Sequence, residues 1–278
     1  AFHSMLKIAV INQKGGVGKT TTAVNLAQAF ALLGKRVLLI DLDPQGNATQ
    51  GLSVPLETVD ASVANLIRDR EFVAEQAIYK GDLIDLIPAT PLLARVEREM
   101  VGVTNSEHRL ARQIQKLRSA YDCIVLDTPP TFGPLMNSAL NAADRIIVPV
   151  DSSYFALVGI KELLSEVREI QASTNPGLEI MGYLLTLTDQ TKITGEVIDS
   201  LVANFGEKVM ETKIRRSVRL REAPALGKTI FHHAPSSSGA EDYMALAREI
   251  EYRLDAEVVQ EEIIRQNRFS LVAGGLCE

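Results

Sequence analysis

The sequence predicts a single α/β domain in which a mostly parallel, twisted sheet is covered by helices on both faces. Three observations lead to this prediction. Short β-branched segments alternate with amphipathic helical segments along the chain. The strand segments are unbroken apolar runs, which is typical of strands buried on both faces. The 278 residues, of which 46% are hydrophobic and 23% are charged, suffice for one large core.

The same alternation gives the order of the elements. The expected strands lie near residues 6–12, 36–41, 83–87, 122–127, 145–150 and 180–186. The expected helices lie near residues 19–33, 61–68, 105–119, 134–142, 156–172, 191–204 and 239–254. Ligands of parallel α/β sheets bind at the carboxyl ends of the strands, so the functional site is expected at that edge.

We find no repeat and no internal domain boundary. Residues 1–4 precede Met5 and have no signal-peptide character, so we interpret them as a cloning remnant. Residues 5–254 form the expected domain, and residues 255–278 form a C-terminal helix or tail. This tail has apolar residues at helical spacing but two arginines against five acids. A membrane-anchoring helix needs a basic face, so we expect the tail to pack onto its own domain.

Composition indicates a cytoplasmic protein. The longest apolar runs, such as Ile146–Val150, are far shorter than the ~18–20 residues of a membrane span. Two cysteines, Cys123 and Cys277, give neither a disulfide framework nor metal-ligand spacing. The net charge of −6 argues against nucleic acid, but residues 205–232 hold seven basic residues against three acidic ones, a local excess of +4.

A glycine-rich loop, Asn12–Thr22 (NQKGGVGKTTT), joins the first strand to the first helix. Its glycines let successive backbone N–H groups face phosphate oxygens at the positive end of the helix. In such a P-loop, Lys19 reaches the β and γ phosphates and the Thr20 hydroxyl is placed to ligate Mg²⁺. Gln13 stands where the usual pattern begins with glycine. The residues expected to bind nucleotide are Lys14, Gly15, Gly16, Val17, Gly18, Lys19, Thr20 and Thr21.

Three carboxylates follow buried strands at the same edge. Asp41 and Asp43 leave the second strand, and alternate strand residues share a face, so both point toward the nucleotide. Asp127 ends the apolar run Cys123–Leu126, which is the Walker B pattern of an acid that contacts Mg²⁺ through water. We expect Thr20, Asp41 and Asp127 to support the magnesium ion, and no other metal site.

The motif K-G-G-x-G-K-T, with its additional Lys14, resembles the deviant Walker A motif of the ParA/MinD P-loop ATPases. The resemblance extends over about residues 5–253 and is closest to ParA/Soj partition proteins. It implies an ATP-sandwich homodimer in which Lys14 reaches the partner's phosphates. The segment Asp41–Asn47 (DLDPQGN) is similar to the family's switch I, so Asp43 is expected to orient the attacking water. The resemblance therefore assigns catalysis to Lys14, Lys19 and Asp43.

Two further segments are similar to the family. Thr128–Thr131 (TPPT) looks like switch II, which passes the difference between ATP and ADP to the dimer face. Thr212–Pro224 resembles the segment in which a strand end contacts adenine and a helix carries DNA-binding arginines. The expected DNA contacts are Arg216, Arg219, Arg221 and Lys228. An arginine run without aromatic residues suits phosphate contacts, so binding should be independent of sequence and sensitive to salt.

This chain departs from the family at two positions. Arg215 stands where relatives commonly have proline, and Ser238 stands where they commonly have arginine. The first departure concerns adenine packing and the second removes one expected DNA contact. Arg221 replaces a residue that is often serine, and it is the residue we expect to compensate.

The resemblance implies a slow Mg·ATP-dependent ATPase that dimerises with ATP and binds nonspecific duplex DNA on the nucleoid. A ParB-like protein would stimulate it, and a chromosome, plasmid or protein assembly would be its cargo. Three alternatives remain. A MinD-like membrane-cycling ATPase would need a basic amphipathic tail, and an iron–sulfur carrier would need cysteines at the dimer axis. A module that only senses nucleotide would not need Asp43.

Overall fold

The computed structural model describes residues 5–153 and 156–274. In these ranges six parallel strands form one sheet in the order β3-β2-β4-β1-β5-β6. The strands are β1 (Leu6–Val10), β2 (Val37–Asp41), β3 (Asp85–Ile87), β4 (Cys123–Asp127), β5 (Arg145–Asp151) and β6 (Glu179–Thr186). Each overlaps its predicted segment, so the predicted α/β class and parallel sheet are confirmed.

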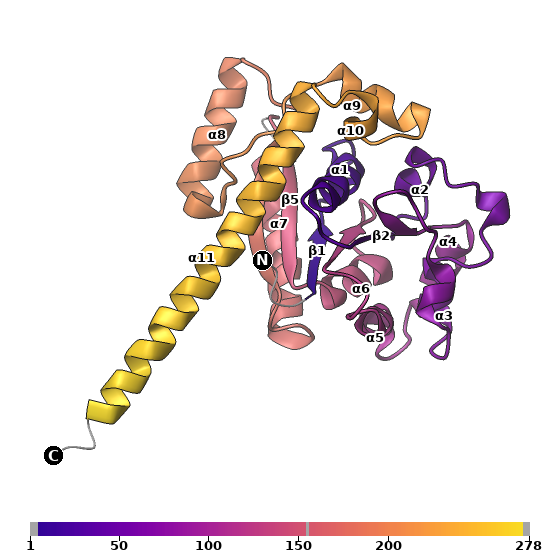
Figure 1. Cartoon of the computed structure of the whole chain (residues 1–278), viewed down its shortest axis with the longest axis horizontal. Coiled ribbons are helices and arrows are strands. Elements are labelled where there is room, and N and C mark those ends of the chain that lie inside the picture. Colours follow the sequence, from indigo (N-terminus) through magenta and orange to yellow (C-terminus); the bar gives the residue numbers. More distant parts are fainter. Residues whose placement is uncertain (1–4, 154–155, 275–278) are drawn as a thin grey trace.

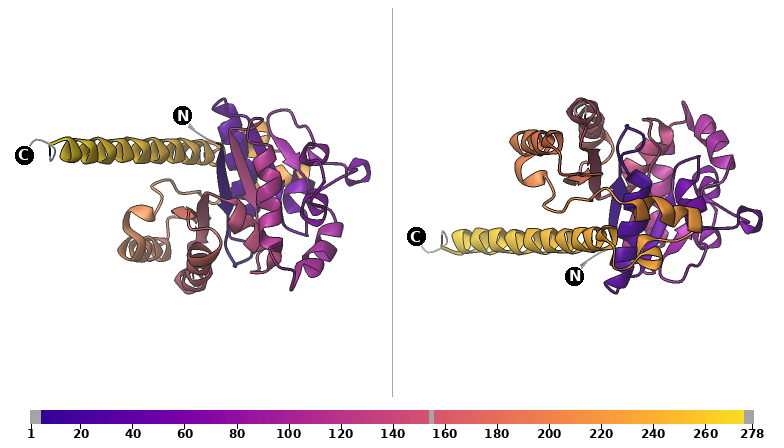
Figure 2. Two further views of the ribbon diagram at one scale, coloured as in Figure 1. Left: turned by 90° about the horizontal axis from the view of Figure 1, so that it is seen from below. Right: turned by 90° about the horizontal axis from the view of Figure 1, so that it is seen from above.

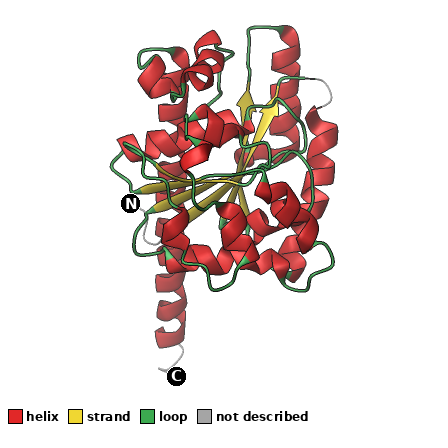
Figure 3. Ribbon diagram, turned by 90° about the vertical axis from the view of Figure 1, so that its right-hand side faces the viewer, coloured by secondary structure: helices red, strands yellow, loops and turns green. Residues whose placement is uncertain are grey.

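Helices cover both faces of this sheet, as Figure 3 shows. They are α1 (Lys19–Leu32), α2 (Asn47–Gly51), α3 (Val63–Arg68), α4 (Leu92–Met100), α5 (Arg109–Lys116), α6 (Pro134–Ala142), α7 (Ala156–Ser173), α8 (Lys192–Phe205), α9 (Val218–Glu222), α10 (Ile230–His233) and α11 (Ser238–Gly274). The sequence predicted neither α4 nor the short α2. None of the described helices is long and apolar enough to cross a membrane.

Alternate side chains of each strand enter two separate cores. In β1, Ile8 and Val10 pack beneath α1 and α11, while Ala9 lies on the opposite face with α3 to α7. Leu38 and Leu39 of β2 divide in the same way. All five of these side chains have no exposed area. The sheet is thus buried on both faces, and the loops at its carboxyl edge have a rigid base.

Helix α11 differs from the expectation for the C-terminus. It runs without interruption through the predicted boundary at residue 254 and continues past the sheet, away from the domain (Figures 1 and 2). Glu257 still reaches Arg145 at 3.0 Å, and the neighbouring Val259 is 57% exposed. The expectation that the tail packs onto its own domain therefore holds only where Glu257 contacts Arg145, and beyond that point the backbone of the helix extends away from the domain. A strong local helical preference and the absence of any break at residue 254 account for the continuous helix.

Candidate functional site

Three strand ends meet at the carboxyl edge of the sheet. Asp127 at the end of β4 lies level with Val10 of β1 on one side and with Asp41 of β2 on the other. The glycine-rich loop follows β1 directly, so the register alone brings the loop and the carboxylates together. The sequence-predicted nucleotide residues therefore surround one place in the fold.

The glycine-rich loop has the backbone that its sequence predicts. Gly16 and Gly18 have φ of 77° and 84°, a region that other residues rarely adopt, and α1 begins immediately afterwards. Lys19 is buried, and its ammonium group donates to the backbone oxygen of Lys14 at 3.1 Å. Burial lowers the pKa of Lys19, while the carboxylates of Asp127 and Asp43 act in the opposite direction.

Two other loop residues support the site without forming its wall. Val17 is buried, and its carbonyl accepts a hydrogen bond from the Thr186 hydroxyl at 2.8 Å. Asn12 donates to the carbonyl of Pro149 at 2.6 Å and accepts from the Lys14 N–H at 2.9 Å. These hydrogen bonds tie the loop to β5 and β6, and they fix the direction of the backbone N–H groups of the loop.

Asp127 is the residue that most clearly needs a cation. It has no exposed area, and neither of its carboxylate oxygens has a partner with hydrogen-bond geometry in the described part of the chain. Burial raises its pKa well above the usual range, and Asp41 and Asp43 add to the effect, whereas nearby Thr20 and Lys19 oppose it. An unpaired buried carboxylate is costly, so Mg²⁺ fits this position.

The magnesium ion would depend on the nucleotide for most of its ligands. In residues 5–153 and 156–274, no group of three or more His, Cys, Asp or Glu side chains could hold a metal ion. Mg²⁺ commonly takes one or two protein ligands and completes its shell with water and phosphate oxygens. The hydroxyl and the few carboxylates beside the phosphate-binding loop are protein ligands of this number and type.

Asp41 is satisfied by the protein itself. Its carboxylate accepts hydrogen bonds from the Asp43 N–H at 3.1 Å, the Thr49 N–H at 2.9 Å and the Thr49 hydroxyl at 2.7 Å. Burial raises its pKa to about 6, although the hydrogen bonds from Thr49 and Asp43 oppose this. Asp41 thus holds the Asp43–Thr49 loop in place, and a role beside Mg²⁺ stays a prediction.

A cavity of about 400 Å³ opens beside these groups. Asp43 faces it from the loop after β2 and Pro130 from the loop after β4, and Asn47, Lys228 and Pro224 also line it. The loop residues that line it are Gly15, Gly16, Gly18, Lys19, Thr20 and Thr21. A second cavity of about 330 Å³ shares Gly18, Thr21 and Pro224 with the first and extends toward Tyr243. Together they have the size of a nucleotide site.

Lys14 does not line either cavity. Its ammonium group lies on the rim, where it bonds Asp151 at 2.7 Å and the Ser153 hydroxyl at 2.6 Å. The Lys14 side chain is 42% exposed, whereas Lys19 beside the cavity is 8% exposed. One lysine of the loop thus serves its own cavity, and the other faces outward.

Comparisons with known proteins agree with this geometry. A family model described as an AAA domain matches residues 5–180. The chain is 46% identical over 249 residues to the chromosome-partitioning ATPase Soj of Thermus thermophilus, covering 89% of this chain and 96% of that protein. It is 45% identical to the sporulation initiation inhibitor protein Soj of Bacillus subtilis, covering 87% and 97%.

The chain belongs to the Soj/ParA family of chromosome-partitioning ATPases. Membership makes it an ATPase that uses ATP and Mg²⁺ in chromosome partitioning. A Mycobacterium smegmatis crystal structure named cobyrinic acid a,c-diamide synthase, with a bound ATP analogue and magnesium, is 32% identical. Its TM-score is 0.77, with 88% of this chain and 93% of that one covered. Cyanothece apo McdA, 21% identical with a TM-score of 0.80 over 90% and 99%, shares the fold.

The four basic residues expected to contact DNA do not share one environment in this Soj/ParA protein. Arg216 and Arg219 are exposed, and Arg219 pairs with Glu222 at 2.9 Å. Arg221 lines the second cavity, and Lys228 lines the first one. All four side chains are exposed, and two of them, Arg221 and Lys228, also lie next to the nucleotide site.

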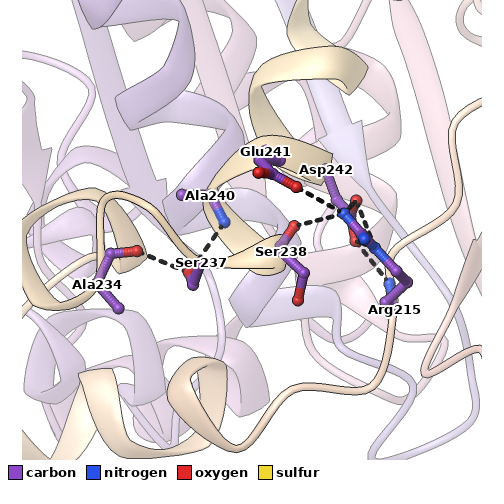
Figure 4. A network of polar contacts seen from close by, with 7 residues as sticks. All are labelled: Arg215, Ala234, Ser237, Ser238, Ala240, Glu241 and Asp242. Atoms are coloured by element: carbon purple, nitrogen blue, oxygen red, sulfur yellow. Dashed lines mark hydrogen bonds and ion pairs between the residues drawn. The ribbon is translucent and has the colours of Figure 1, made fainter.

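The two departures from the family pattern meet in space (Figure 4). Arg215 donates to the Asp242 carboxylate, with its closest contact at 2.6 Å, and to Glu241 at 3.1 Å. It also reaches the backbone oxygen of Ser238 at 3.4 Å. Asp242 and Glu241 hold the pKa of Arg215 above its usual value. Arg215, which forms an isolated β-bridge with Thr188, is thus tied to the first turn of α11.

Several residues near the site were missed from sequence. Tyr243 of α11 shares a 3.2 Å hydrogen bond with Thr22 of α1 and lines the second cavity. Burial raises the pKa of Glu97 on α4, and the Asp43 carboxylate adds to the effect, so this acid lies close to the site. Asp151 is the rim partner of Lys14. Tyr243 lay on the predicted helix 239–254, and Glu97 lay on a segment whose apolar spacing could have shown a helix.

Cys123 offers no exposed ligand for an iron–sulfur cluster. It lies fully buried at the start of β4, and burial raises the pKa of its thiol. Cys277, the other cysteine, lies outside the described residues.

Proposed function

We propose that this ATPase forms an ATP-sandwich homodimer, binds nonspecific duplex DNA in that form and releases it after hydrolysis. A ParB-like protein would stimulate hydrolysis, and repeated cycles on the nucleoid would position a chromosome or other cargo. The observation that supports the proposal is that the two lysines of the loop lie in different places. Lys19 lines its own cavity, whereas Lys14 lies outside it, paired with Asp151, and would leave this acceptor to reach a partner's phosphates.

The chain's own residues supply distinct steps in this scheme. The loop N–H groups and the Lys19 ammonium bind and orient the phosphates. Thr20 and Asp127 would hold Mg²⁺, which draws charge from the phosphates during transfer. Asp43 lines the cavity and accepts the Gln45 N–H at 2.9 Å, a position from which it would orient the attacking water.

A lysine from the partner subunit would then complete the site. Lys14 of each protomer would bring positive charge to the γ-phosphate of the other, where charge develops in the transition state. Dimerisation would thereby depend on the triphosphate. Pro130 of the Thr128–Thr131 segment lines the cavity, so loss of the γ-phosphate would change the position of this segment at the rim of the cavity.

DNA binding would follow from valency. Arg216 and Arg219 are exposed, and phosphate contacts of single patches are weak. A dimer presents two patches, and their joint binding greatly exceeds either one. Contacts of this kind carry no base recognition, so the proposal predicts sequence-independent binding that falls with salt.

A mobility-shift assay on nonspecific duplex DNA tests the proposal. It compares ATP, ADP and no nucleotide at two salt concentrations, with Arg219→Glu beside the wild type and Lys161→Glu, an exposed cation on α7, as the control. We expect a shift with ATP alone, weakened by salt and lost in Arg219→Glu but kept in the control. Absence of a shift in every nucleotide state would refute DNA binding and make liposome binding the next question.

A further inference from the structure

A cationic cleft lies between α3 and α5, helices that pack together in the lower part of Figure 1. Its volume is about 380 Å³, within the ~300–1,000 Å³ typical of small-molecule sites. It shares no lining residue with the two nucleotide cavities. The cationic residues that line it are Arg70, Arg109, Arg112 and Lys116.

The positive charge of this cleft is not neutralised by the protein. Glu71 is the single acid among the lining residues, which leaves an excess of three positive charges in a chain of net charge −6. No ion pair joins any of the four cations to a carboxylate in the described part of the chain. Cations gathered without partners repel one another, so the cleft favours an anion.

Two lining residues also carry buried polar atoms without a partner. These are the Nε of Arg109 and the Oε1 of Gln113, which is 2% exposed. Both side chains donate hydrogen bonds to backbone carbonyls at the C-terminal end of α3 and just after it. Arg109 donates from Nη1 to the carbonyl of Ile67 at 3.3 Å, and Gln113 donates from Nε2 to the carbonyls of Asp69 and Arg70 at 3.2 Å.

These hydrogen bonds at the end of α3 use only some of the polar atoms of Arg109 and Gln113. The two carbonyls fix the amide orientation of Gln113, because its Nε2 must face them, so Oε1 is left as an acceptor without a donor. The same holds for the Nε donor of Arg109. Buried polar groups are normally paired, so an unpaired donor and an unpaired acceptor on two residues that line the cleft favour a bound polar molecule.

We propose that the cleft binds a small phosphate-bearing molecule that also carries a hydrogen-bond donor. Guanidinium groups match phosphate oxygens with paired N–H bonds, and Gln113 and Glu71 are acceptors for hydroxyl or amino groups. A DNA duplex cannot enter a cleft of this volume, although it could contact Arg112 and Lys116 from outside. The site would therefore give the ATPase a second small ligand, separate from its nucleotide.

Calorimetry on the full chain, saturated with Mg·ADP so that the P-loop is filled, tests the cleft. The probes are ribose 5-phosphate, which has hydroxyl donors, and inorganic phosphate. Wild type should bind ribose 5-phosphate saturably and more tightly than phosphate. Arg112→Glu, at an exposed position, should weaken this binding about tenfold or more, since a charge-assisted contact is lost and repulsion is added. Lys161→Glu on α7 should bind as wild type does.

Four results would count against the assignment. Wild type that binds neither probe, or Arg112→Glu that binds as tightly as wild type, would remove the site. Equal affinity for the two probes would remove the role of the buried acceptor. A loss of DNA binding by Arg112→Glu, with neither probe bound by wild type, would make the surface a DNA contact instead. Nucleotide binding by Arg112→Glu should stay unchanged, which keeps this test apart from that of the proposed function.

Discussion

The contact between Lys14 and Asp151 should oppose dimerisation. In the single chain, the Lys14 ammonium is held by Asp151 at 2.7 Å and by Ser153 at 2.6 Å. A lysine that must reach a partner's phosphates has to leave these acceptors first. Asp151→Asn keeps the shape of the side chain but removes the charge, so it should release Lys14 and strengthen the ATP-dependent dimer.

The size of the effect follows from the exposure of the pair. The Lys14 side chain is 42% exposed and that of Asp151 is 19% exposed, so the pair belongs with ion pairs worth about 0.2–1 kcal/mol. A symmetric dimer breaks two such pairs, about 0.4–2 kcal/mol in total, which corresponds to a dimer dissociation constant about 2- to 30-fold lower. High salt should shrink the difference between variant and wild type.

Sedimentation equilibrium with a non-hydrolysable ATP analogue measures that constant. Asp144→Asn is a matched control, because Asp144 also pairs with a lysine, Lys7, at 2.8 Å, but at the start of β5 rather than its end. The control should dimerise as wild type does. If Asp151→Asn leaves the dissociation constant unchanged or raises it, Lys14 does not have to leave Asp151, and the reasoning fails.

Three further outcomes are expected. Asp127→Asn should raise the melting temperature without nucleotide, because it removes an unpaired buried charge, but should abolish stabilisation by Mg·ATP in the same thermal assay. Burial acts to raise the pKa of Glu249, but two backbone N–H groups donate to its carboxylate and a nearby arginine pairs with it, so its pKa in the folded protein is lowered. The stability that Glu249 adds is therefore present above its unfolded pKa of ~4.3 and is lost as the pH falls through its folded pKa. Urea titrations from pH 7 to pH 3 should show Glu249→Gln converging with wild type at low pH. Asp242→Ala leaves Arg215 without its main acceptor and should cost about 1–3 kcal/mol in urea unfolding, whereas Glu241→Ala, at an exposed position, should cost under about 1 kcal/mol.

The strands and the nucleotide loop could be predicted because their signals are local. Short, mostly apolar segments marked all six strands, and the spacing of glycines and lysines marked the loop. Helix α4 was missed although Leu93, Val96 and Met100 have helical spacing and are buried. Charged residues lie between them, and the segment follows Pro88 and Pro91, which favoured a loop in the sequence.

The partners of the site residues could not be predicted, because they come from distant parts of the chain. Thr49 reaches back to Asp41 only when α2 turns above β2, and Ala89 in turn donates to the Thr49 hydroxyl at 3.0 Å. Arg215 and Asp242 are 27 positions apart and meet through the packing of α11. The same packing placed two of the four exposed basic residues, Arg221 and Lys228, beside the cavities, which their sequence pattern did not show.

The direct test of the account is complementation between Lys14→Ala and Asp43→Ala. Each variant alone should hydrolyse almost no ATP. In a mixed dimer, the site of the Lys14→Ala protomer keeps its own Asp43 and receives Lys14 from its partner, so one complete site forms. Half the dimers in an equal mixture are mixed, and one of their two sites works, so the ATPase rate should recover to about a quarter of wild type. No recovery would mean that Lys14 acts within its own subunit, which would contradict the sandwich dimer.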